Sequence, residues 1–208
     1  MKHSLLLVAV VALVAFAAPA HSQYMYIDVN GDGVNTVADD VISPATTHLD
    51  IYLDTGHGAD GTPAVCSSSS NPFTMNSYEV ILRSTGTITF ADPSSGGWTD
   101  NMSFATVLGN AIAGTDVYMG RGSGTVLPPS TYKLGSIAVS GIVGTPVVNI
   151  VSSTSALATA LTSFGSQCEG LDFDNTLKLG SDWNDVHGTY TTTPVSQTTW
   201  GQIKNLYK

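Results

Sequence analysis

The sequence predicts an all-β protein whose strands form an antiparallel β-sandwich of the jelly-roll type, with a short helix at the C-terminus. Thr, Ser, Val and Gly are abundant while Lys, Glu, Arg and Gln are scarce, a composition typical of strands and turns. Many short segments of apolar or alternating character are separated by turn residues, and no repeated helical segment lies between them. Strands without intervening helices favour an antiparallel sandwich over a parallel sheet.

The N-terminus predicts export. A positive charge in the first three residues is followed by the apolar run Leu5–Ala18, which ends in small residues and is typical of a cleavable signal peptide over 1–22. The run is short for a membrane span, and no later stretch approaches the necessary length, so we expect no membrane-spanning segment. The protein is therefore expected to be secreted or held at the cell surface, or periplasmic if it is retained.

About 185 residues remain after the signal peptide, enough for one domain with small appendages. We divide them into a strand with a loop at 23–45, the sandwich at 46–190, and a polar linker with an amphipathic helix at 191–208. In that last segment Trp200, Ile203 and Leu206 stand at helical spacing.

Four elements are expected in the first half of the chain. Tyr24–Ile27 predicts a short strand, and Val37–Ile42 has room for one or two helical turns. His48–Asp54 alternates apolar and polar residues, as a half-buried strand does. Ser77–Phe90 carries the strongest strand pattern, with a bulge or a tight hairpin expected near Ser84–Gly86.

The second half of the chain is punctuated by glycines. Further strands are expected at Asp116–Met119 and Leu171–Leu179, while the stretch before Met119 is ambiguous. Gly120–Gly124 predicts a loop. Thr131–Ser140 and Thr145–Ser152 each alternate well, and we expect them to form an antiparallel pair around a turn at Gly141–Gly144.

The charged residues argue against nucleic acid as a partner. Asp and Glu total 16 against 7 Lys and Arg, which gives a formal net charge of −9. A nucleic-acid-binding surface would need the opposite balance. The surplus carboxylates are candidates for cation ligands, or they form an acidic, solubilising surface.

The two cysteines, Cys66 and Cys168, both lie in the exported part of the chain. Export makes a disulfide between them the expected state, with two free buried thiols as the alternative. Closing a loop of about a hundred residues would stabilise the fold by about 4–5 kcal/mol in the chain-entropy model.

A candidate metal site follows the first strand directly, in the segment Asp28-Val29-Asn30-Gly31-Asp32-Gly33. Short oxygen-bearing side chains alternate along a twelve-residue loop, a glycine permits the sharp turn, and a carboxylate closes the loop. Calcium prefers about six to eight oxygen ligands at about 2.4 Å, which this pattern can supply. The alternative is an ordinary Asx-rich turn. The expected ligands are Asp28, Asn30, Asp32, the Val34 carbonyl, Thr36 and Asp39.

This loop resembles the calcium loop of dockerin modules over about a dozen residues. The layout of Ser77–Phe90 and Tyr132–Val151 is similar to that of cohesin-like and related carbohydrate-binding sandwiches. The loop together with the segment Phe164–Cys168 also resembles a group of uncharacterised secreted bacterial proteins. These resemblances imply a cohesin-like sandwich that carries a calcium loop.

A second acidic cluster lies late in the chain, after Cys168. If the predicted disulfide forms, this cluster would face the loop Asp54–Gly61. We therefore consider a second cation site, with solvated loop carboxylates as the alternative. Its candidate ligands are Asp54, Asp60, Asp172 and Asp174.

The sequence contains no serine nucleophile elbow and no paired histidine spacing for zinc, so we expect a protein that is not an enzyme. The favoured function is a secreted, calcium-binding structural or adhesion module that acts through protein contacts or self-assembly. One alternative is a carbohydrate-binding module that recognises a surface polysaccharide, with Trp183 as the candidate sugar platform. The other is a glycoside or ester hydrolase, since 14 Asp and 2 Glu could supply a catalytic pair.

Overall fold

The computed structural model describes residues 24–36, 41–58, 61, 63–65, 71–151, 153–157, 160–169, 172–174 and 186–187. Strands make up nearly all of this part of the chain, together with short 3-10 helices at Pro93–Ser95 (η2) and Ser155–Leu157 (η3). The strands are β1 (Tyr24–Asp28), β2 (His48–Asp54), β3 (Met75–Phe90), β4 (Trp98–Asp100), β5 (Thr106–Ala113), β6 (Asp116–Leu127), β7 (Thr131–Ile150), β8 (Ser163–Glu169), β9 (Asp172–Asp174) and β10 (Val186–His187).

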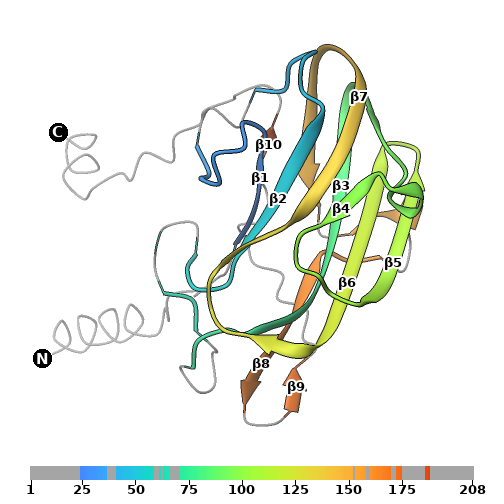
Figure 1. Cartoon of the computed structure of the whole chain (residues 1–208). Coiled ribbons are helices and arrows are strands. Elements are labelled where there is room, and N and C mark those ends of the chain that lie inside the picture. The colour runs from blue at the N-terminus through green and yellow to red at the C-terminus, as the bar shows by residue number, and fades with distance from the viewer. Residues whose placement is uncertain are drawn as a thin grey trace, which may run out of the picture.

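The strands form two layers that share the long strand β7 (Figure 1). In one layer β1 pairs with β2, and the first half of β7 lies between β2 and β4. In the other layer the second half of β7 pairs with β3 and β10, and the order continues to β6 and β5. Strand β8 pairs with the start of β3 and carries β9. Every pairing is antiparallel, so the predicted antiparallel sandwich is confirmed.

The expected antiparallel pair at Thr131–Ser140 and Thr145–Ser152 is wrong, because both segments belong to the single strand β7. Gly141 and Gly144 have left-handed φ values of 63° and 71°, but they bend β7 rather than reverse it. The register with β3 shifts twice opposite this bend, around Thr87. The bulge predicted in β3 is confirmed there. Its Gly86 has a φ of 87°, and a β-carbon on it would lie 3.1 Å from Pro146 Cα.

The loop expected at Gly120–Gly124 is also wrong, because these residues continue β6. Gly120 lies opposite Glu79 and Gly122 opposite Ser77 in the ladder with β3. The glycines pair as any strand residues would, since the neighbouring strands supply partners for their backbone groups on both sides. Because glycine has no side chain, the outer surface of the sheet is depressed along β6.

The core lies between the two layers and follows the alternation of the strands. Apolar residues of both layers meet in one buried cluster that includes Met25, Ile27, Leu49, Ile51, Ile137, Val80, Leu82, Val117, Met119 and Ile150. A smaller cluster of Ile81, Tyr118 and Ala160 lies on the outside of the second layer, beneath the segment that contains η3. The outer face of that layer is therefore partly covered and partly open.

Within the described residues, no helix is long and apolar enough to cross a membrane. The predicted signal peptide (1–22) and the C-terminal linker and helix (191–208) lie outside the described residues, as does most of the helical turn expected at Val37–Ile42. These remain predictions, as does the division of the chain into segments.

Candidate functional site

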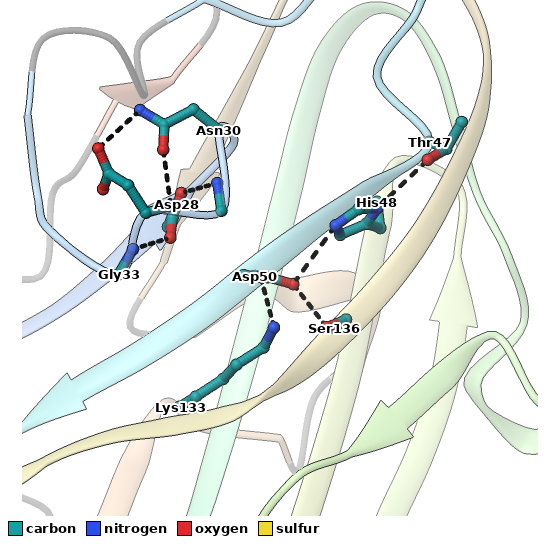
Figure 2. A network of polar contacts seen from close by, with 10 residues as sticks. Asp28, Asn30, Gly33, Thr47, His48, Asp50, Lys133 and Ser136 are labelled. Atoms are coloured by element: carbon teal, nitrogen blue, oxygen red, sulfur yellow. Dashed lines mark hydrogen bonds and ion pairs between the residues drawn. The ribbon is translucent and has the colours of Figure 1, made fainter.

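The predicted calcium loop begins at Asp28, the last residue of β1. The Asp28 side chain is buried, and its two oxygens accept backbone N–H groups from Gly31 (2.6 Å) and Gly33 (2.7 Å) (Figure 2). Gly31 and Gly33 have φ values of 79° and 78°, which favour glycine. The carboxylate therefore organises the turn around itself.

The next two oxygen-bearing side chains continue this pattern. Asn30 Oδ1 accepts the Asp32 N–H at 2.8 Å, and Asp32 Oδ1 accepts the Val34 N–H at 2.8 Å. The Asn30 amide also donates to Asp32 Oδ2 at 3.1 Å. The three side chains are thus held close to their own loop in the alternating order that the sequence predicts.

The chemistry of this donor set fits calcium. The acceptor atoms of the Asp28, Asn30 and Asp32 side chains are all oxygens. A carboxylate oxygen that accepts one N–H keeps a second lone pair that can bind a cation. Asp39, the closing residue, lies outside the described residues. Among the residues that the structure describes, no three His, Cys, Asp or Glu side chains gather as a metal cluster. The calcium site therefore stays a prediction.

Tyr26, the middle ring of a stack of three tyrosines, anchors the loop to the outer face of the β1–β2 layer. The Tyr26 hydroxyl donates to the Gly33 carbonyl at 2.8 Å. The Tyr26 ring stacks on Tyr52 with centroids 5.1 Å apart and on Tyr24 with centroids 5.5 Å apart. Burial, followed by the charge of nearby acidic groups, raises the pKa of Tyr26, so its hydroxyl remains a donor at neutral pH. The loop is consequently packed onto the sandwich.

An ion pair between the buried Asp50 and the partly exposed Lys133 lies beside the loop on the same face (Figure 2). Asp50 Oδ2 lies 2.5 Å from Lys133 Nζ, and Asp50 Oδ1 accepts the Ser136 hydroxyl at 2.5 Å. The His48 ring is 3.9 Å from the same carboxylate. These contacts join β2 to β7 and satisfy a buried carboxylate, which is a structural role.

The second predicted cation site is only partly described. Asp54 Oδ1 accepts the backbone N–H groups of Gly56 (2.7 Å) and His57 (2.9 Å), and Asp54 Oδ2 accepts the Thr131 hydroxyl at 2.9 Å. Asp54 thus closes a turn at the end of β2. Asp60 lies outside the described residues, while Asp172 and Asp174 belong to β9, whose backbone alone is described. The second site stays a prediction.

The predicted disulfide and the predicted sugar platform involve residues outside the described part of the chain. Cys168 is in β8, but Cys66 lies outside the described residues, so the disulfide stays a prediction. Trp183, the candidate sugar platform, also lies outside them.

Strand β5 presents an exposed apolar surface that the sequence pattern did not predict. Among the described strands β5 pairs only with β6, so it forms the edge of the second layer. It exposes 58% of Val107, 48% of Leu108 and 44% of Ile112. The sequence feature that could have indicated this surface is the absence of charged residues from Thr106–Ala113. An uncharged edge strand with exposed apolar side chains is typical of a contact surface.

Comparisons with known proteins are sparse. No protein-family model matches the chain, and the search of curated proteins finds no match. Among solved structures, the chain is similar to a type III cohesin module from the cellulosomal cell-surface anchoring scaffoldin ScaE of Ruminococcus flavefaciens. The TM-score is 0.45 at 10% sequence identity, with 81% of this chain and 84% of that chain covered. At that distance the similarity transfers no residue roles and no partner to this chain.

Proposed function

We propose that this chain is a secreted, non-catalytic interaction module that associates through its β5 edge, and that calcium stabilises its N-terminal loop. The observation that supports the contact surface is the edge strand β5, which is uncharged and exposes Val107, Leu108 and Ile112. Exposed strand edges accept a further strand through backbone hydrogen bonds, and apolar side chains then become buried.

A second copy of the chain is the partner that this edge fits best. The chain has a net charge of −9, so two copies repel each other over most of their surfaces. The segment Thr106–Ala113 adds no charge to that repulsion, so copies can approach along β5 at a low electrostatic cost. The register shift between Val107 and Gly109 limits continuous pairing, which favours a defined contact over an endless sheet.

The proposed role of calcium is structural. Binding at Asp28, Asn30 and Asp32 would offset the repulsion between carboxylates and stabilise the folded state by an amount that grows with the logarithm of the free calcium concentration above its Kd. Since Tyr26 donates to the Gly33 carbonyl, a more rigid loop would also order the outer face of the β1–β2 layer.

Size-exclusion chromatography with light scattering over a range of concentrations tests the contact surface. The wild-type chain is expected to grow from monomer to assembly as concentration rises. Val107→Lys and Ile112→Lys place charges on the edge and should shift association to at least about tenfold higher concentration, equivalent to about 1.4 kcal/mol. Both residues are exposed, so their substitution should change the free energy of unfolding by no more than about 0.5 kcal/mol.

Val143→Lys is the matched control, because Val143 is 66% exposed on β7 and lies outside the edge strand. It should associate like the wild-type chain. A wild-type chain that stays monomeric at every concentration would contradict self-association through β5. Equal weakening by the Val143 and β5 variants would show that general charge, rather than this edge, controls association.

A further inference from the structure

A groove lies on the outer face of the second layer, on strands β3, β5, β6 and β8. Its volume is about 640 Å³, within the range typical of small-molecule sites. A second hollow of about 410 Å³ lies next to it, and both are lined by Glu79 and Leu108. The two hollows therefore form one extended depression with Glu79 near its middle.

Glycines keep this depression open. A β-carbon at Gly109 would lie 2.5 Å from Tyr118 Cε1, and one at Gly120 would lie 2.9 Å from the Tyr118 hydroxyl. The Tyr118 ring can therefore lie close against the backbone of β5 and β6 and reach toward β3. Gly122 and Gly124 line the groove further along β6, where the strand backbone forms part of its floor.

Glu79 is held in a fixed orientation by hydroxyl groups from two other strands. The Tyr118 hydroxyl donates to Glu79 Oε1, and the Ser163 hydroxyl donates to Glu79 Oε2 at 3.0 Å. Burial and the hydrogen bond to Glu79 raise the pKa of Tyr118, so this donor is retained at neutral pH. Each carboxylate oxygen keeps a lone pair with which it can accept a further hydrogen bond from a ligand.

The other polar groups of the groove are neutral. Asn76, Ser77, Thr106 and Ser123 contribute an amide and three hydroxyls, and no Lys, Arg or His side chain lines the groove within the described residues. The nearby Arg121 is buried and donates to Asn110 and to the Gly120 carbonyl, so an anionic ligand would meet the Glu79 carboxylate with no cation in contact. A ligand with several hydroxyls can instead donate to Glu79 and exchange hydrogen bonds with the neutral groups, while its C–H face packs on Leu108.

We propose that this groove binds a neutral carbohydrate. A basic side chain is a weaker fit than a sugar, because both Glu79 oxygens already accept a hydroxyl and the remaining groups suit hydroxyl partners. The groove has a single carboxylate in its lining within the described residues, whereas the usual glycosidase mechanism requires two. The site is therefore suited to binding rather than to hydrolysis. The groove shares Leu108 with the β5 contact, but Val107 and Ile112 do not line the groove and Glu79 and Gly124 do not belong to β5, so variants at these residues test the two proposals separately.

Affinity electrophoresis of the exported chain tests the proposal. Native gels would contain a soluble cellulose derivative, an arabinoxylan, a galactomannan or a dextran, with alginate as the anionic comparison and a gel without polysaccharide as the reference. At least one neutral polysaccharide should retard the wild-type chain. Glu79→Gln removes the charged acceptor, and Gly124→Leu fills the groove at a position where a β-carbon meets no atom within 4 Å. Each substitution should raise the dissociation constant obtained from the retardation at least tenfold.

Thr145→Leu is the matched control, because it adds the same side chain at an exposed strand position outside the groove. It should be retarded like the wild-type chain. Light scattering on the same samples separates this result from the β5 contact, since the groove variants should associate normally. The proposal is overturned if no neutral polysaccharide retards the chain, if only alginate does, or if retardation persists in both groove variants.

Discussion

Asp116 joins three segments of the chain through its buried carboxylate at the start of β6. Arg83 of β3 donates to both carboxylate oxygens, from Nε at 2.8 Å and from Nη2 at 2.9 Å. Thr154, which precedes η3, donates its hydroxyl to the same carboxylate. These contacts, led by the hydrogen bond from Arg83, hold the pKa of Asp116 below its ordinary value despite burial. The ionised carboxylate therefore stabilises the folded chain.

Asp116→Asn should lower the free energy of unfolding by about 2 kcal/mol at neutral pH, a moderate figure because Arg83 is partly exposed. A depressed folded-state pKa gives stability that is present above the unfolded-state value and is lost as pH falls through the folded-state value. The wild-type chain should thus lose more stability than the variant on acidification below about pH 4.

Urea unfolding from neutral to acidic pH measures this difference. Asp92→Asn is the control, since Asp92 accepts the Ser94 N–H at an exposed cap of η2 and should cost about 1 kcal/mol or less. Parallel pH profiles for the wild-type chain and Asp116→Asn would contradict the role assigned to this carboxylate.

The segment Asp28–Gly33, the predicted calcium loop, shows what spacing along the chain can predict. The alternation of Asp28, Asn30 and Asp32 and the placement of Gly33 depend on residues close together in the chain, so spacing alone reveals them. The three side chains accept N–H groups of their own loop backbone, an arrangement that a calcium loop and an Asx-rich turn both allow, so the calcium site stays a prediction.

Calcium should raise the melting temperature of chelator-treated protein, because a ligand at about a hundred times its Kd stabilises the folded state by about 2.7 kcal/mol. The double variant Asp28→Asn, Asp32→Asn keeps hydrogen-bond acceptors in the loop but removes two charges. Its melting temperature should no longer respond to calcium.

Isothermal titration calorimetry with matched thermal melts provides the measurement. Asp92→Asn, which changes an Asx cap outside the loop, should respond to calcium like the wild-type chain. An undiminished calcium response in the double variant would show that the loop is an ordinary turn and that calcium binds elsewhere.

The strand elements show where sequence reasoning reaches its limit. The pattern of His48–Asp54 predicted β2 to the residue, because alternation is a local property. The glycines of β6 and β7 suggested a loop and a turn, because turn propensity is also local. Pairing with β3 converts the first set into strand and the second into a bend, and a partner more than thirty residues away is not visible in the local pattern.

The surfaces proposed for binding could not be predicted for a related reason. Glu79 occupies an ordinary outward position in a strand, and only the fold brings Tyr118 and Ser163 to it. Val107 and Ile112 become notable only because the strand order leaves β5 at an edge. A sequence pattern predicts that a strand exists, but its place in the sheet depends on the pairing of all the others.

The molecule consists of two layers around a shared core, and the outer faces of the two layers differ in what they carry. The β1–β2 layer carries the loop, the tyrosine stack and the partly buried Asp50–Lys133 pair, which together stabilise its outer face. The opposite layer carries the groove and the free edge of β5. This division predicts a stabilised face and a binding face on one sandwich.

Amide hydrogen exchange at low and high protein concentration tests the central claim most directly, because it reports which strand edge becomes protected when copies associate. The account predicts that exchange slows with concentration in Thr106–Ala113, where the β5 amides not bonded to β6 have no strand partner in the part of the chain that the structure describes. Exchange should stay constant in Tyr24–Asp28 of the other layer. Association with unchanged exchange in β5, or with protection confined to β1, would contradict the proposed contact edge.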